Sequence, residues 1–331
     1  MRRPAALTLL VAALLAGCGG ERERDPVEQV PASARDQVAA AQEVDVSAFP
    51  QPGASLEEMA AELETGGPQA APATSVFRTG ENRLAFGVLD ENVRFVYGDT
   101  VVYVQHMEGG PVKGPFAAPA DVLVTEGRYR SEQAASEEDP FAAVYEAMLP
   151  LDRTGIWNAL VVSDLGDGRR IAAPLRFEVV SPRADKIPDV GEKAPKVDTD
   201  TVATAKGNLE AIDTRVPPAE ELHRENFADL HGKQPVALLF ATPQLCASRV
   251  CGPVVDQALQ LKARYGDRIA FIHQEVYVDN RVDRGLRPPL QHFALQTEPW
   301  LFVVGADGRV TARLEGSFGL RAFERALQSA L

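Results

Sequence analysis

The sequence predicts two folded domains, an all-β sandwich followed by an α/β domain, behind an N-terminal segment without a fold of its own. Three observations predict this. Apolar residues alternate with period two between residues 76 and 181. An unbroken apolar run, Val236 to Phe240, leads into a pattern of helical period. Residues 18–75 contain a single aromatic residue, Phe49. The chain of 331 residues, 45% of them hydrophobic, is long enough for both domains.

The charge of the chain excludes one class of partner. A formal net charge of -13 and a pI near 5.0 leave no basic surface of the kind that binds nucleic acid. We therefore expect no nucleic-acid partner, and no motif in the sequence calls for a cofactor or a metal.

The N-terminus has the pattern of a secretion signal. Arg2 and Arg3 precede an apolar stretch over residues 7–15, which is too short to span a membrane comfortably, and Leu15-Ala16-Gly17-Cys18 follows. This pattern resembles a bacterial lipoprotein signal. The resemblance implies removal of residues 1–17, lipidation of Cys18 and a location at the extracytoplasmic face of the cell membrane. The alternative is an ordinary secretory signal in which Cys18 is incidental.

Residues 18–75 are rich in Ala, Glu, Gln and Pro. Such a composition cannot bury enough apolar surface to offset the entropy of ordering, so it predicts a lipidated flexible tether, with a short helix allowed near residues 56–63.

Residues 76–181 are predicted to form several short strands. The alternation is clearest around Phe86, Val102 and Phe177, and Gly-rich turn signals separate the runs. The segment resembles the immunoglobulin-like modules of secreted bacterial proteins, with Tyr145 and Trp157 as its expected aromatic core. His106 and Met107 are expected to lie in solvent beside a turn rather than to bind a metal.

Residues 182–206 are predicted to be a linker, because prolines and a glycine recur among charged residues. From about residue 190 the sequence reads VGEKAP, which is similar to the lead-in before extracytoplasmic thioredoxin-like and peroxiredoxin-like domains. The second domain is expected over residues 207–331.

The second domain reads as a βαβ unit followed by a ββα unit. The buried strand at residues 235–240 precedes a helix with one apolar face that ends at Gly266, and a strand at residues 269–278 follows. A hairpin turns at Ala306-Asp307-Gly308, and an apolar-faced helix closes the chain. A βαβ unit joined to a ββα unit is the thioredoxin fold.

Three short motifs strengthen that resemblance. Cys246 follows the buried strand, Pro253 looks like the proline kink of the active-site helix, and Thr297-Glu298-Pro299 matches the cis-proline turn. The stretch WLFVVGADGRV, from residue 300, is also similar to membrane-anchored thioredoxin-like reductases. The resemblance implies a thiol-disulfide oxidoreductase whose partners are extracytoplasmic protein thiols or disulfides.

The expected chemistry uses both cysteines of the motif. Cys246 at a helix N-terminus would be the attacking thiolate, and Cys251 would resolve the mixed disulfide. An isolated pair in an oxidising compartment is expected to form a Cys246–Cys251 disulfide. A cis Pro299 would hold Glu298, beside Thr297, where its backbone can pair with a substrate strand.

One departure from the family pattern concerns spacing. The reductases have two residues between their cysteines, and this chain has four. Five positions on a helix turn through about 500°, so the side chains would point apart. The disulfide therefore requires Cys246 to lie in the loop, or the first turn to unwind.

Three other functions are compatible with these residues. The Cys-x4-Cys spacing after Thr242 resembles atypical two-cysteine peroxiredoxins, although Pro243 stands where their threonine is expected and only Arg249 offers an arginine. A copper chaperone would recruit His273 or His292 to the cysteines. A binding module with a structural disulfide is the third. His223, His231 and His292 otherwise look like surface or helix-end residues, and Glu275 is either a proton relay or a solvated strand end.

Overall fold

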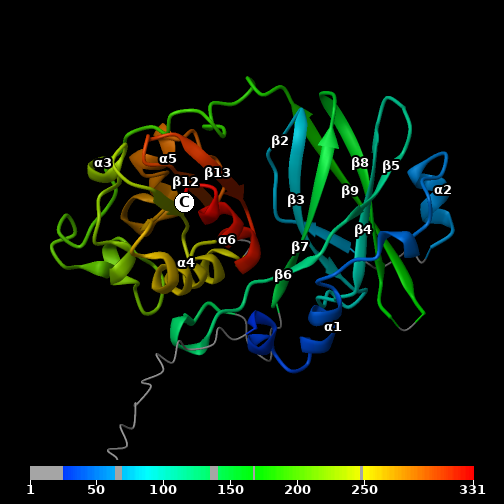
Figure 1. Ribbon diagram of the computed structural model, residues 1–331, viewed down its shortest axis with the longest axis horizontal. Helices are drawn as coiled ribbons and strands as arrows, with labels where there is room; N and C mark the ends of the chain where they lie inside the picture. Colours follow the sequence, from blue (N-terminus) through cyan, green and yellow to red (C-terminus); the bar gives the residue numbers. More distant parts are fainter. Residues whose placement is uncertain (1–24, 64–68, 135–140, 167, 247–248) are drawn as a thin grey trace, which may run out of the picture.

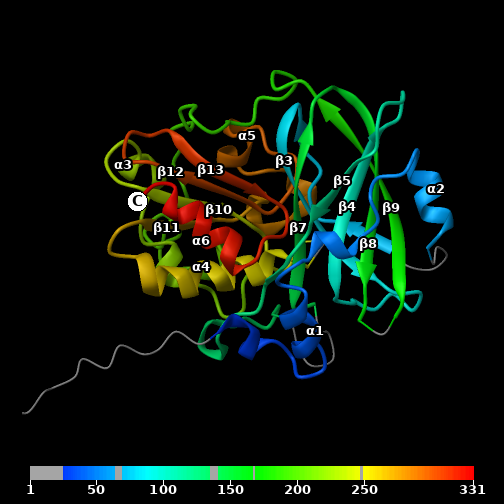
Figure 2. The same ribbon diagram turned by 45° about the vertical axis from the view of Figure 1, so that its right-hand side comes forward.

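The computed structural model describes residues 25–63, 69–134, 141–166, 168–246 and 249–331. Two β-rich parts lie side by side, with β7 at their boundary (Figures 1 and 2). The predicted signal and Cys18 lie outside the described residues. Within the described ranges, no helix is long and apolar enough to cross a membrane.

Two sheets make up the N-terminal part. The first has the order β1 (Gln69–Pro72), β3 (Gly80–Leu89), β7 (Ala143–Leu151), β6 (Ala120–Val122). The second has the order β2 (Phe77–Arg78), β9 (Arg170–Val180), β8 (Gly155–Asp164), β4 (Asp99–His106), β5 (Lys113–Ala117). All pairs are antiparallel except β2 with β9.

Both sheets contribute side chains to one core. Phe86 and Tyr145 come from the first sheet, and Val102 and Trp157 come from the second. The period-two alternation of the sequence produces this arrangement, because every second side chain of a strand points to the same face. Tyr145 and Trp157 are both buried, as predicted. The immunoglobulin-like kinship of the two sheets stays a prediction.

The C-terminal part, residues 187–331, contains the third sheet. Its order is β11 (Ala270–Gln274), β10 (Val236–Phe240), β12 (Trp300–Val304), β13 (Val310–Glu315). β10 runs parallel to β11 and antiparallel to β12, which is antiparallel to β13. The predicted βαβ unit and ββα unit are both present.

Helices cover both faces of this sheet. The longer α4 (Cys251–Tyr265) and α6 (Leu320–Gln328) pack on the face that carries Leu239 and Leu301. The short α3 (Phe227–Leu230) and α5 (Pro288–His292) pack on the face that carries Phe240 and Phe302. A strand buried on both faces needs apolar residues at every position, which explains the unbroken run in β10.

The tether prediction is wrong for residues 25–63. This segment forms η1 (Pro26–Gln29), α1 (Arg35–Ala40), η2 (Val46–Ala48) and α2 (Leu56–Ala61). Val30 and Val38 join the core between the two sheets. Phe49, Leu56 and Met59 instead cover the outer face of β4 and β8 (Figure 1), a face made apolar by Val101, Tyr103, Leu160 and Val162. Its apolar residues are few, but they meet surfaces that would otherwise face water.

The predicted linker packs against the C-terminal part. Ile187, Ala194 and Val197 are buried in its core. The backbone N–H groups of Gly191 and Ala194 donate to the carbonyls of Val310 and Gly308, at 2.8 and 3.0 Å. Residues 187–197 therefore belong to the C-terminal part.

The two parts are joined by buried polar contacts. The Asp121 carboxylate, which is 3% exposed, accepts backbone hydrogen bonds from Arg321 and Ala322 at the start of α6, at 3.0 and 2.8 Å. Glu315, the last residue of β13, accepts hydrogen bonds from the Ser75 hydroxyl and the Val76 backbone. Burial raises the pKa of Asp121 above its ordinary value.

Candidate functional site

The helix that carries the site begins at the second cysteine. Cys251 is the first residue of α4, and Cys246 lies in the loop between β10 and α4. This corrects the prediction that Cys246 occupies the helix N-terminus. Pro253 also falls in the first turn, where the missing N–H breaks no helical hydrogen bond, so it starts the helix rather than kinking it.

The two thiols are neighbours. Both cysteines are buried thiols that form no disulfide, and the Cys246 side chain lies within hydrogen-bonding reach of Cys251. The predicted disulfide is therefore not formed in this structure. Because Cys246 lies in the loop, the thiols approach each other without unwinding α4. Arg249 and Val250, the described residues of the spacer, come before the first residue of α4.

Burial controls the acidity of Cys251. Desolvation and the neighbouring Cys246 raise the pKa of the Cys251 thiol well above its usual value, while a hydrogen bond from the Thr242 backbone opposes this shift. A helix N-terminus contributes only about 0.3–1 kcal/mol in favour of a thiolate, whereas full burial can shift a pKa by several units. Burial therefore wins, and Cys251 is a protonated thiol near neutral pH.

A cis-proline turn lies beside the thiols. The Glu298–Pro299 peptide bond is cis, and Pro299 is buried. Burial first, and then the negative charges of Cys246 and Glu275, raise the pKa of Glu298. Burial first, and then the negative charges of Glu298, the two cysteines and Glu275, raise the pKa of Tyr277. Glu298 and Tyr277 therefore lie within electrostatic reach of the cysteine pair, and both also lie within reach of Glu275.

Thr297 has a different role from the one predicted. Its hydroxyl donates to Glu315 at 3.1 Å and accepts a hydrogen bond from the Trp300 indole at 3.0 Å. Because Glu315 is also bonded to Ser75, the Thr297 side chain belongs to the contact between the two parts of the molecule.

Glu275 is fully buried rather than solvated. Its carboxylate accepts hydrogen bonds from the backbone and hydroxyl of Thr214 and from the Val276 backbone. The Thr214 hydroxyl also accepts a hydrogen bond, at 3.1 Å, from the backbone of Gln244 in the cysteine loop. Thr214 therefore connects Glu275 to the loop that carries Cys246.

A segment of the N-terminal part covers the start of α4. Ser131 donates two hydrogen bonds to Asp256, at 2.9 and 3.0 Å, and the Glu132 backbone N–H donates to the Val216 carbonyl at 2.9 Å. Gln133 packs against Gly252, the residue after Cys251. The sandwich is therefore part of the wall around the cysteines.

Two of the histidines, His223 and His106, do not match their predicted places at the surface. His223 is fully buried, and with His273 and Asp213 it forms a cluster of side chains that are 0% exposed. His106 is buried and packs against Trp157. Its ring nitrogens contact the Thr154 carbonyl, just before β8, and the Glu108 backbone N–H. The other three residues fit expectation better, since Met107 and His292 are exposed and His231 is half-buried.

Sequence reasoning missed Tyr277, Thr214 and Asp213. Tyr277 lies two residues after the buried Glu275, which itself follows the last residue of β11. A charged residue and an aromatic residue close together at the end of a strand were the available signal. Thr214 and Asp213 lie in a segment without regular periodicity, and nothing local connects them to residues about 60 positions away.

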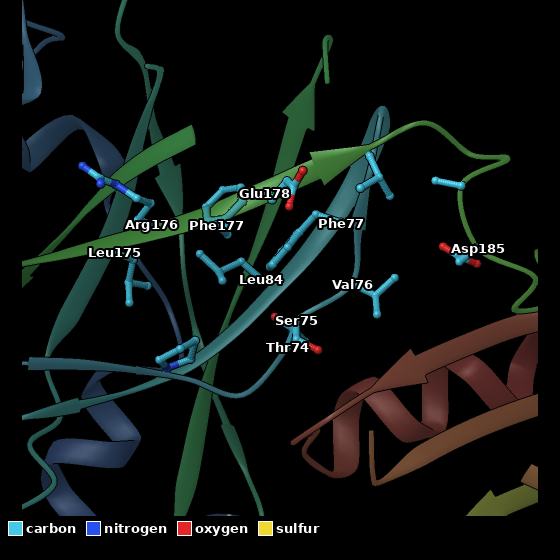
Figure 3. Close-up of a pocket in the computed structure, with 13 residues that line it drawn as sticks. Thr74, Ser75, Val76, Phe77, Leu84, Leu175, Arg176, Phe177, Glu178 and Asp185 are labelled. Carbon is cyan, nitrogen blue, oxygen red and sulfur yellow. The ribbon is translucent and has the colours of Figure 1, made fainter. Parts of the chain in front are cut away.

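A large apolar cavity lies apart from the cysteines. It measures about 460 Å³ and opens between β2 and the end of β9, where the rings of Phe77 and Phe177 are 4.4 Å apart (Figure 3). Glu178 and Asp185 supply carboxylates at its edge. None of its lining residues belongs to the cysteine site. We therefore identify the candidate site from its reactive thiols and not from the size of a cavity.

Comparison with known proteins gives structural likeness only. No protein-family model matches the sequence, and no curated protein matches it. Two solved structures from Chlorobium tepidum are similar. One, a putative thiol:disulfide interchange protein DsbE, is 15% identical with a TM-score of 0.31, and the match covers 43% of this chain and 98% of that chain. The other, a thiol:disulfide interchange protein of the thioredoxin family, is 17% identical with a TM-score of 0.29, covering 42% and 94%. Likeness at this level does not transfer an activity to this chain.

Proposed function

We propose that the protein is a thiol-disulfide oxidoreductase that acts on protein substrates through Cys246 and Cys251. The observation that carries the proposal is the contact between the two thiols beside cis Pro299, with the deeper thiol held protonated by burial. Such a pair has one thiol placed to react first and a second placed to resolve.

The reaction proceeds in two exchanges. The Cys246 thiolate attacks one sulfur of a substrate disulfide, which forms a mixed disulfide and releases the first substrate thiolate to take up a proton. Cys251 then loses its proton and attacks the Cys246 sulfur, which closes the Cys246–Cys251 disulfide and releases the second substrate thiol. Two electrons pass from the protein dithiol to the substrate, and the reverse sequence oxidises a substrate dithiol. Glu298 is the candidate acceptor for the Cys251 proton, because it is close enough to influence the pKa of that thiol.

A redox titration tests the proposal. The protein is equilibrated in thiol-disulfide buffers, trapped with an alkylating reagent and analysed by mass spectrometry. We expect a reversible two-electron transition of the pair, and a mixed disulfide on Cys246 when Cys251→Ser is incubated with a disulfide-bonded protein such as insulin. A Cys246–Cys251 bond that resists strong thiol buffer would overturn catalysis and leave a structural disulfide.

The same preparations separate the other candidate activities. Rapid consumption of hydrogen peroxide by the reduced protein would favour a thiol peroxidase. One tightly held Cu(I) that is lost in Cys246→Ser would favour a copper chaperone. Neither His273, whose Nε2 lies 3.0 Å from the Ala241 carbonyl, nor the exposed His292 has a cysteine as a hydrogen-bond partner among the contacts described above.

We also propose that the protein works at the extracytoplasmic face of the cell membrane, held by lipid on Cys18, with an immunoglobulin-like sandwich beside the redox domain. The signal-like sequence of residues 1–18 supports the anchor. Because the described fold begins at Asp25, the chain from Cys18 reaches no further than about 25 Å. Asp25 would then lie within about that distance of the membrane surface. Fractionation tests this: Cys18→Ala should move the protein from the membrane to the soluble fraction, and unchanged membrane association would contradict the anchor.

A further inference from the structure

Asp213, His223 and His273 bring one carboxylate and two imidazoles together inside the C-terminal part. The Asp213 Oδ2 atom lies 3.2 Å from His223 Nε2, and Asp213 Oδ1 lies 3.6 Å from His273 Nδ1. All three side chains are 0% exposed. The ligand atoms of the cluster all lie within 4.8 Å of one another.

The hydrogen bonds of His273 leave one of its nitrogens without a partner. Its Nε2 lies 3.0 Å from the Ala241 carbonyl, which can only accept, so Nε2 carries a proton. In the neutral ring, Nδ1 is then a lone pair that faces the Asp213 carboxylate, and it has no hydrogen-bond partner in the described structure. Two acceptors that face each other in a dry interior need a proton or a metal cation between them.

We propose that this cation is a first-row divalent metal ion of the zinc type, bound by Asp213, Nε2 of His223 and Nδ1 of His273. Bonds of 2.0–2.2 Å to a tetrahedral ion place neighbouring ligand atoms about 3.4 Å apart. The ligand atoms of this cluster, one from each residue, all lie within 4.8 Å of one another, and each imidazole faces its own oxygen of Asp213. Two imidazoles and one carboxylate form a nitrogen and oxygen donor set that suits this class of ion.

The surroundings hold two of the ligands in place. The Ala241 carbonyl orients the His273 ring, which is the usual outer partner of a metal-bound histidine. The Asp213 oxygens accept hydrogen bonds from the backbones of Arg215 and Ala219, at 2.9 and 2.7 Å. His223 would carry its proton on Nδ1, which has no partner among the described residues.

The ion would tie an irregular segment to the central sheet. Asp213 and His223 come from the segment before β10, and His273 lies within β11. Thr214, which follows Asp213, holds Glu275 and the backbone of the cysteine loop. The metal is therefore a structural tie beneath the redox site, and it stands independently of the proposed oxidoreductase activity.

The test uses a double variant, Cys246→Ser with Cys251→Ser, so that no thiolate can bind metal. After dialysis against a chelator, elemental analysis is expected to find about one divalent ion per chain, and refolding with Co²⁺ is expected to give the visible absorption of a tetrahedral site. Asp213→Asn or His273→Gln in that background should lower metal affinity at least 10-fold. His292→Gln, which alters an exposed histidine, should retain the ion.

A measurement on the ligand-intact protein guards against variants that do not fold. The double cysteine variant refolded with Zn²⁺ should melt at a higher temperature than the same protein refolded with a chelator, as binding to the native state alone requires. Absence of retained metal, of Co²⁺ absorption and of any melting shift would overturn the proposal. The cluster would then be an ion pair between Asp213 and a protonated His273.

Discussion

Gln133 and Gly252 face each other across the boundary between the sandwich and the cysteine helix, and a Cβ atom added to Gly252 would lie 2.5 Å from the Gln133 Cβ. Gly252→Ala is therefore expected to cost about 1–3 kcal/mol of unfolding free energy through overpacking. It should also alter the reactivity of the adjacent Cys251. Urea denaturation and the alkylation rate measure the two effects.

Two further variants make this prediction specific. Adding Gln133→Gly removes the clashing carbon, so the double variant should recover part of the stability that Gly252→Ala loses. Gly127→Ala is the matched control, since a Cβ at that position meets no atom within 4 Å. Equal effects of the Gly252 and Gly127 substitutions would mean that the boundary is not packed as described.

A second prediction concerns the ion pair of Arg215 with Asp256, 2.8 Å apart, whose side chains are 4% and 1% exposed. Removing one partner of a buried pair leaves an uncompensated charge and typically costs about 3–5 kcal/mol. We expect a loss of that order for Arg215→Met. Arg224→Met is the control, because the pair of Arg224 with Glu220 is 60% and 53% exposed and should contribute at most about 1 kcal/mol.

The loss in Arg215→Met should also depend on pH. Burial already raises the pKa of Asp256 above its ordinary value near 3.8, although Arg215 opposes the shift. A carboxyl whose folded-state pKa is raised favours the folded state most when it is protonated, so its contribution is lost as pH rises through that pKa. The deficit relative to the unmutated protein should therefore shrink toward low pH. A deficit that grows on acidification would contradict this assignment.

The cysteines should differ in their reaction with iodoacetamide. Because burial holds the pKa of Cys251 well above that of an ordinary thiol, its thiolate fraction stays small until the pH is strongly alkaline. Cys246 should be modified first at neutral pH, and Cys251 should follow only as pH rises. Peptide mass spectrometry after timed quenching measures the order, and the urea-unfolded protein, in which both cysteines react alike, is the control. Earlier modification of Cys251 would exchange the two roles.

Local periodicity was enough to predict the strands around Phe86, Val102 and Phe177, the strand β10 and the long helix α4. The apolar run in β10 and the one-sided helix α4 are encoded within their own residues. The position of Cys246 relative to the first residue of α4 is not encoded in this way, because a spacer of four residues is compatible with a loop or with a helical turn. Contacts made by residues 131–133 and 214 determine where the helix begins, and no local sequence pattern predicts those contacts.

The cluster of Asp213, His223 and His273 also depends on contacts that no local sequence pattern predicts. His223 lies among polar residues, so its sequence neighbourhood indicates a surface position, yet Asp213 and His273 enclose it from 10 and 50 positions away. By contrast, the sequence of β4 indicates that something must pack on its outer face. Val101 and Tyr103 alternate with Val102 and Val104, and a strand that is apolar on both faces needs a cover on both.

The N-terminal segment, residues 25–63, gives the last prediction, which separates a packed segment from a flexible tether. Val38 is 0% exposed and packs in the core between the two sheets, whereas Val46, in the same segment, is 38% exposed. Val38→Asp places a carboxylate in an apolar site and should cost more than about 3 kcal/mol, or abolish folding of the sandwich. Val46→Asp should change stability by less than about 0.5 kcal/mol. Urea denaturation of both variants measures the difference, and equal, small effects would indicate that the segment is a flexible tether.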